Sequence, residues 1–163
     1  MSLNKSVGLS ILIVVFLFSC ASRPPLHEKE RTIAVWDLDD LSPSKAARSN
    51  LGELLSNQII EVLKKRETYK VIERERLLLA LEELRLGTTF LVDETTRLRL
   101  GQLIGARWMI FGGYQVIGGN MRIDLRLVEV ETGKITKAVQ KMVPAGNVQG
   151  WMDATQKAAE GLF

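Results

Sequence analysis

Cysteine and histidine are nearly absent from the chain, which has one of each, Cys20 and His27, among 163 residues. A disulfide within the chain is therefore impossible, and a Cys/His metal cage has too few ligands. His27 follows Pro25 and precedes a charged run, so we interpret it as a solvated side chain. On these grounds we expect neither a metal nor a cofactor.

Long runs of one charge are also missing. The formal net charge is only +3, and positive and negative residues are interleaved, so nothing indicates a nucleic-acid partner. There is no internal repeat and no low-complexity tract. With 46% hydrophobic and 25% charged residues, the chain can bury the core of one domain.

The N-terminal apolar run is short. Met1 to Ser6 is polar and carries Lys5, and the apolar run Val7 to Phe18 falls below the roughly 20 residues of a membrane-spanning helix. Small residues follow at once. This order is typical of a cleavable signal peptide, which we place at residues 1–19.

The junction Leu17-Phe18-Ser19-Cys20 resembles the lipobox of bacterial lipoproteins, which implies lipidation of Cys20. The alternative is a secretory signal with an incidental cysteine, but a lone thiol at the cleavage site favours acylation. Stable anchoring at a membrane requires more than one acyl chain or other membrane signal, and a lipidated cysteine of this type carries several acyl chains. Ala21 replaces the aspartate of an inner-membrane retention signal, so we expect the outer membrane, on its periplasmic face.

Residues 20–31 contain two prolines and many charges, which indicates the lipidated cysteine followed by a tether. From Ala21 to Arg31 the extended tether reaches roughly 35 Å. Residues 32–163 form the predicted domain, which is therefore held close to the membrane.

Apolar periodicity predicts the elements of this domain. The first helix should bury Leu51, Leu54, Leu55, Ile59, Val62 and Leu63, and the second Leu77, Leu81 and Leu84. Asp93 should cap the third helix. The predicted order is strand 32–38, helix 46–66, strand 69–72, helix 73–86, helix 93–104, strand 106–116, strand 121–127, strand 135–143 and helix 148–162.

We therefore predict a mixed α/β (α+β) fold of order β-α-β-α-α-β-β-β-α, in which helices pack on a mixed sheet. The first β-α-β unit should be a right-handed parallel crossover. The last three strands should form an antiparallel meander, with a tight turn at Gly118-Gly119-Asn120.

Several segments resemble the CsgG-like family, named for the outer-membrane lipoprotein of curli secretion. They are Val71-Ile72-Glu73-Arg74, Leu77 to Leu84, Leu98 to Ala106 with its "GQLIGA" helix end, Ile110-Phe111-Gly112-Gly113, and Leu127 to Ile135 with its "ETGKI" turn. The resemblance covers roughly residues 31 to 160. Lipoprotein activators of penicillin-binding proteins look similar over the same stretch. Curli channel subunits carry long barrel-forming inserts, but the connections here are short, so the resemblance implies the core domain without the pore.

Asp37, Asp39 and Asp40 follow the first strand, where open α/β sheets often bind ligands. Such carboxylates could hold a metal or serve a hydrolase. No second cluster or nucleophile motif accompanies them, so a solvated loop from Asp39 to Ser44 is the preferred interpretation.

Arg122, Asp124 and Arg126 alternate with apolar residues on one predicted strand, so they share its wet face. Arginine is enriched at protein interfaces. We therefore hypothesise that this face, with Trp151 at its rim, contacts a partner or a second copy. The alternatives are a solvated face and cover by the last helix, and a packing role for Trp151.

Together these features predict a non-enzymatic, outer-membrane-anchored lipoprotein that serves protein–protein interaction in curli-type secretion or envelope assembly. The alternative is activation of a peptidoglycan synthase, a penicillin-binding protein. A hydrolase or metal site at the aspartates is the weaker alternative. The expected partners are the membrane, through the N-terminal lipid, and an envelope protein or a second copy, with no small-molecule substrate.

Overall fold

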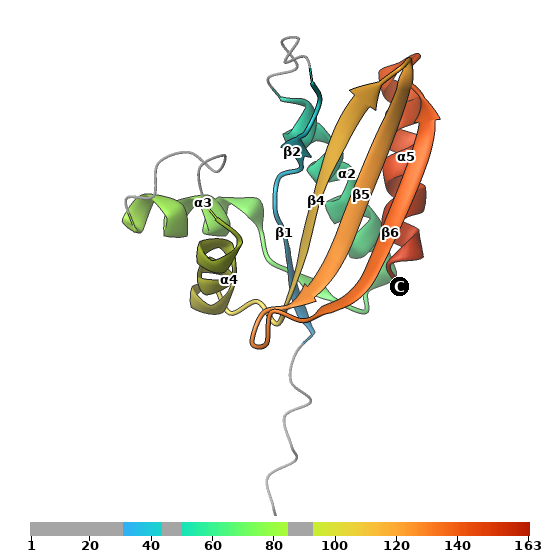
Figure 1. Ribbon diagram of the computed structural model, residues 1–163. Coiled ribbons are helices and arrows are strands. Elements are labelled where there is room, and N and C mark those ends of the chain that lie inside the picture. The colour runs from blue at the N-terminus through green and yellow to red at the C-terminus, as the bar shows by residue number, and fades with distance from the viewer. Residues whose placement is uncertain (1–30, 44–49, 85–92) are drawn as a thin grey trace, which may run out of the picture.

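The computed structural model describes residues 31–43, 50–84 and 93–163 (Figure 1). The signal segment, Cys20, His27 and all but the last residue of the predicted tether lie outside the described residues. The strands are β1 Thr32–Val35, β2 Asp39–Asp40, β3 Lys70–Val71, β4 Trp108–Ile117, β5 Asn120–Glu129 and β6 Ile135–Pro144. The helices are α2 Leu51–Arg66, α3 Arg74–Glu83, α4 Glu94–Leu103 and α5 Val148–Gly161.

The strands form one mixed sheet in the order β3-β1-β4-β5-β6. β1 runs parallel to β3 and to β4, whereas β4, β5 and β6 form an antiparallel meander. Gly118 and Gly119, with φ of 56° and 76°, make the two-residue turn between β4 and β5, a conformation that glycine adopts without strain. The predicted mixed α/β class is confirmed.

One predicted loop is wrong at its start. Asp39 and Asp40 form β2, which pairs in parallel with Gly113 and Tyr114 of β4. The amide of Leu41 extends the ladder by donating to the Tyr114 carbonyl at 2.8 Å. Gly113 permits this pairing, because a Cβ there would lie 3.0 Å from the Asp39 carbonyl oxygen. A two-residue strand has no periodicity that the sequence could reveal.

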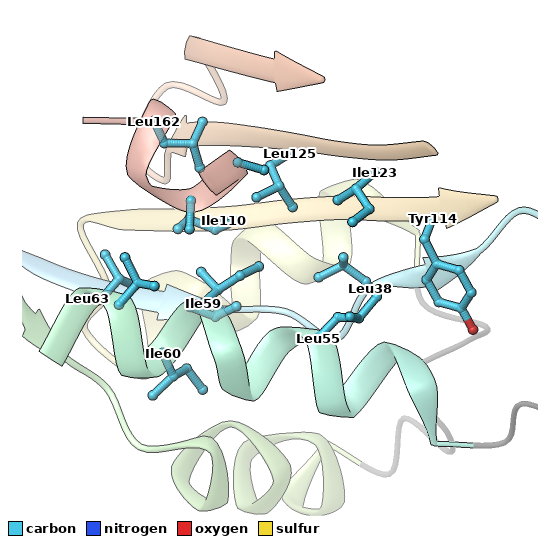
Figure 2. Packing of buried hydrophobic residues seen from close by; sticks show 14 of the residues in the cluster. Leu38, Leu55, Ile59, Ile60, Leu63, Ile110, Tyr114, Ile123, Leu125 and Leu162 are labelled. Atoms are coloured by element: carbon cyan, nitrogen blue, oxygen red, sulfur yellow. The ribbon is translucent and has the colours of Figure 1, made fainter. Parts of the chain in front are cut away.

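Helices α2 and α5 cover one face of the sheet, which we call the back face (Figure 1). Figure 2 shows Leu55, Ile59 and Leu63 of α2 directed toward side chains of β4 and β5, and Leu162 entering the same layer. Leu54 was expected on this apolar stripe, but it is 40% exposed. Leu54 precedes Leu55 by one residue, and the rotation of about 100° between successive helix residues turns its side chain away from the sheet.

Helices α3 and α4 close part of the opposite face, the front face. Their buried residues Leu77, Leu81 and Leu100 pack with Trp36 and Phe111 of the sheet side. Leu84 was also expected inward, but it is 45% exposed at the end of α3. Asp93 caps α4 as predicted, since its side chain accepts a hydrogen bond from the Thr96 amide at 2.9 Å.

The segment between β1 and β2 is held from behind by α2. The Ser56 hydroxyl accepts a hydrogen bond from the Leu38 amide at 3.0 Å and lies 2.8 Å from the Gly52 carbonyl oxygen, to which it donates. A Cβ on Gly52 would stand 2.2 Å from the Leu38 carbonyl oxygen, so helix and segment are in direct backbone contact. This contact fixes where the neighbouring aspartates point.

Candidate interaction surface

The three aspartates predicted to cluster after β1 bind different partners. Asp37 accepts two hydrogen bonds from Arg74 of α3, at 3.2 and 2.7 Å. Asp39 accepts two from Arg97 of α4, at 2.8 and 3.2 Å. Asp40 accepts from the Ser42 amide at 2.9 Å. Each of the first two is a two-pronged arginine–carboxylate contact, the strongest geometry for such a pair.

These contacts correct the interpretation of the segment as a solvated loop. The side chain of Asp37 is 16% exposed and that of Arg97 is 12% exposed. The hydrogen bond to Asp37 raises the pKa of Arg74 above its ordinary value, against the effect of burial. The Arg97 guanidinium also lies 5.0 Å from the centre of the Trp36 ring, within cation–π range.

Asp37 and Asp39 therefore fasten α3 and α4 to the segment that follows β1. In the described parts of the chain no group of three or more His, Cys, Asp or Glu residues is placed to hold a metal ion. Both oxygens of Asp37 and both oxygens of Asp39 already accept hydrogen bonds from a guanidinium, so these carboxylates are poorly placed to contact a substrate or a metal ion. Local sequence patterns could not have shown these pairs, whose partners lie 37 and 58 residues apart.

Arg122, Asp124 and Arg126 of β5 do share the front face, as the alternation predicted. They alternate with the buried residues Met121, Ile123, Leu125 and Leu127 of the back face. Arg122 and Asp124 form an ion pair at 2.8 Å, and this hydrogen-bonded contact raises the pKa of Arg122. Arg126 lies 3.7 Å from Glu94 at the start of α4.

Apolar side chains surround these charges. Leu41 is 58% exposed, Ile117 55% and Met142 60%. Met142 of β6 is paired with Arg122, and Leu41 lies beside Gly113, which is paired with Asp124. We call Leu41, Ile117, Arg122, Asp124, Arg126 and Met142 the front-face patch. In Figure 1 the strands β4, β5 and β6 stand in front of α2 and α5, with their near sides toward the viewer.

Trp151 does not belong to this patch. It lies on α5 and packs, half-buried, against the back-face core. Its expected place at the rim of the wet strand face is therefore wrong, because α5 covers the other side of the sheet. The structure instead adds Leu41 and Met142. Met142 could have been suspected from the alternation on its strand, whereas Leu41 depends on the unforeseen strand β2.

Solved structures share this fold. The C-terminal domain of LpoB from Salmonella enterica is similar with a TM-score of 0.59 and 14% identity, over 70% of this chain and 82% of that one. Lipoprotein GNA1162 from Neisseria meningitidis gives 0.56 and 14%, over 72% and 82%. A PelC dodecamer from Paraburkholderia phytofirmans gives 0.53 and 10%, over 82% and 88%.

A search of curated proteins gives no match. Within the described ranges, no helix combines the length and the apolar character needed to cross a membrane. The sequence does match a family model, that of the curli production assembly/transport component CsgG, over residues 15–118. The match spans more than half of the 163 residues and includes the aspartate segment, α2 to α4 and β4. The chain belongs to the CsgG family.

Proposed function

We propose that this chain is a lipoprotein of the outer membrane whose domain, at residues 32–163, binds an envelope protein or a second copy of itself through the front-face patch. In this proposal residues 1–19 are the signal peptide, and lipid on Cys20 holds the domain at the periplasmic face. The domain acts without catalysis, as an assembly or secretion component related to the curli system, and it is not itself a pore.

The front-face patch is the observation that carries this proposal. Its arginines and exposed apolar side chains are types enriched where proteins meet, arginine and methionine in particular. The ten-residue strands of the meander supply a rigid platform, since their back face is packed against α5. The dodecameric state named for the PelC structure makes self-association a reasonable form of the contact.

Arg126→Glu tests the patch. The substitution reverses one charge of the patch, at its border with α4, so we expect association to weaken while stability changes by less than about 0.5 kcal/mol. Lys157→Glu on α5 makes the same change of charge on the exposed side of the covering helix and serves as the control. Analytical ultracentrifugation and a crosslinking pull-down from intact envelopes measure association. If both variants associate as strongly as the wild-type protein does, the front-face patch is not the interface.

Cys20→Ala tests the anchor. Acylation of the thiol cannot occur in this variant, so we expect loss of palmitate labelling and of retention in the membrane fraction. Cell fractionation with radiolabelled palmitate measures both. Labelling of the variant equal to that of wild type would show that the lipid is attached elsewhere.

A second candidate function is activation of a peptidoglycan synthase. It is favoured by the sequence resemblance to activator lipoproteins of penicillin-binding proteins and by the fold shared with the LpoB domain. The same pull-down separates the candidates. Capture of a penicillin-binding protein that is lost in Arg126→Glu favours the activator, whereas capture of secretion components or of the chain itself favours the assembly role.

A further inference from the structure

One end of the molecule carries a cavity with an excess of positive charge. It is about 420 Å³ in volume. We call it the basal pocket, and its lining consists of Arg31, Arg66, Thr68, Tyr69, Leu127, Thr136, Lys137, Leu162 and Phe163. Three of these side chains are cations and none is an Asp or Glu.

Four separate elements bring these groups together. Arg31 precedes β1, Arg66 is the last residue of α2, Lys137 lies on β6, and Phe163 follows α5. Figure 1 shows the C-terminal end of α5 at the same end of the molecule as the start of β1. Among the described residues no carboxylate side chain pairs with Arg31, Arg66 or Lys137. Their charges are thus available to an anion.

Arg66 is held in place without being neutralised. Its guanidinium donates to the Glu160 carbonyl at 3.3 Å and lies 5.4 Å from the centre of the Phe163 ring. The Tyr69 and Phe163 rings meet at 4.9 Å and join the back-face core. The pocket lining therefore combines cationic side chains with an apolar wall of two rings, and arginine is the side chain that best matches phosphate oxygens.

A second cavity at the end of the sheet where β1 begins shows that this charge is not a general property of the surface. That cavity, of about 480 Å³, is lined by Thr32, Gln102, Gly105, Ala106, Arg107, Val130 and Glu131. It contains one cation and one carboxylate, so its side chains carry no net charge. Of these two cavities, only the basal pocket has a lining with a net positive charge.

The position of the pocket indicates the source of the anion. Arg31 is both part of the lining and the last residue of the proposed tether, which cannot reach beyond roughly 35 Å when fully extended. Lipid anchoring would hold the pocket at high effective concentration near headgroups. Tyrosine beside arginine and lysine is also typical of groups that meet a membrane surface.

We propose that the basal pocket binds the phosphodiester headgroup of an anionic phospholipid in the membrane that carries the anchor. The proposal rests on the proposed function for the presence of that anchor. The guanidinium of Arg66 and the ammonium of Lys137 contact the phosphate, and the Tyr69–Phe163 wall contacts the glycerol. Bound in this way, the domain stands on its base and presents the front-face patch away from the tether.

The experiment uses the chain as cells process it. Mass spectrometry of the purified protein first shows whether acyl chains are present, which tests the anchor by itself. The acylated protein is then placed in nanodiscs of phosphatidylcholine alone or of an equimolar mixture with phosphatidylglycerol. Hydrogen exchange of the amides around Tyr69 and Lys137 is compared. We expect slower exchange at both places in the discs that contain phosphatidylglycerol.

Two substitutions and a control give the comparison its specificity. Arg66→Gln and Lys137→Gln should each reduce the gain in protection about fivefold, the equivalent of about 1 kcal/mol per cation at an anionic surface. Lys141→Gln removes a charge from the same strand four residues further on, outside the lining, and should leave the gain unchanged. Circular dichroism confirms that each variant is folded.

The outcomes separate the pocket from the anchor. If the protein is acylated but its amides exchange equally fast in the two kinds of disc, the proposal that the pocket binds lipid is wrong, whereas the proposal of a lipid anchor stands. Inorganic phosphate that protects the pocket in phosphatidylcholine discs, with no further effect of phosphatidylglycerol, would overturn it in favour of free phosphate. Protein without acyl chains would overturn the anchor, and the pocket is then tested by cosedimentation with vesicles of the two compositions, with the same variants and the same expected fold-changes.

Discussion

The back and front faces of the sheet are closed by different means. On the back face, α2 and α5 bury the larger apolar cluster, and the buried polar side chains of these two helices are Ser56 and Thr155. On the front face, α3 and α4 bury a smaller apolar cluster, and arginine–carboxylate contacts occupy its margin. Beyond that margin the ion pairs of β5 stand beside exposed apolar residues.

This difference separates stability from recognition. Burial of apolar area is the dominant favourable term in folding, whereas exposed ion pairs contribute about 0–1 kcal/mol each. The back face should therefore carry most of the free energy of unfolding. The front-face patch can change its side chains at little cost, which is what a surface adapted to a particular partner requires.

Leu55→Ala should have the largest effect. Leu55 is fully buried on the back face, and truncation there leaves a cavity that costs about 2–5 kcal/mol. Its neighbour Leu54 is 40% exposed, so Leu54→Ala should cost well under half as much. Urea unfolding with an unchanged m-value measures both. Similar losses for the two variants would mean that the back face does not dominate stability in the way proposed here.

The same pair of leucines shows how far periodicity predicts the fold. Apart from β2, the order of helices and strands, the meander and the mixed sheet followed from apolar spacing, because that spacing reflects which side of an element is buried. Leu54 and Leu84 were assigned inward from the same spacing and are exposed. The apolar stripe of a helix is wider than the area that the neighbouring elements cover. The position of those elements therefore decides which residues at the edges of the stripe are buried.

Arg97→Ala should have an intermediate effect on the front face. The substitution removes two hydrogen bonds to Asp39 and the contact with the Trp36 ring, and it leaves a partly buried carboxylate without its partner. We expect a loss of about 1–3 kcal/mol. Arg97→Lys keeps the charge but not the two-pronged geometry, so it should recover only part of the stability that Arg97→Ala loses.

A double-mutant cycle sharpens this prediction. Asp39→Ala alone should cost less than Arg97→Ala, and the two changes together should cost less than their sum, since the partner is already gone. Additive losses would show that the pair contributes nothing and that only the packing of Arg97 on Trp36 matters. Thermal and urea unfolding of the three variants provide the measurement.

The candidate site was less predictable than the fold, and these residues show why. Alternation on β5 was sufficient to place Arg122, Asp124 and Arg126 on one face. The partners of Asp37 and Asp39 come from helices far along the chain, so no local pattern contains them. Trp151 was misplaced because a helix residue that follows the meander can pack on either side of the sheet, and the sequence does not state which.

Asp93 gives the smallest effect and compares the two faces through their helix caps. On the front face the carboxylate of Asp93 caps α4, and the hydrogen bonds from Thr96 lower its pKa below the ordinary value of 3.8. On the back face the amide of Asn147 caps α5 by accepting from Gly150 at 2.7 Å, and an amide does not titrate. Acid should therefore loosen the start of α4 but not that of α5.

Because the folded-state pKa of Asp93 is depressed, its contribution to stability is fully present above the pKa of the unfolded chain and is lost as the pH falls through the folded value. Asp93→Asn keeps a competent cap and cannot titrate. The stability advantage of wild type over this variant should be constant near neutrality and should shrink as the pH falls below about 4. Hydrogen exchange of the Thr96 and Gly150 amides, measured near neutrality and at about pH 3, shows which helix start loosens in acid. A constant difference between the two proteins down to pH 3, or equal loosening of both helices, would show that the front-face cap contributes no pH dependence.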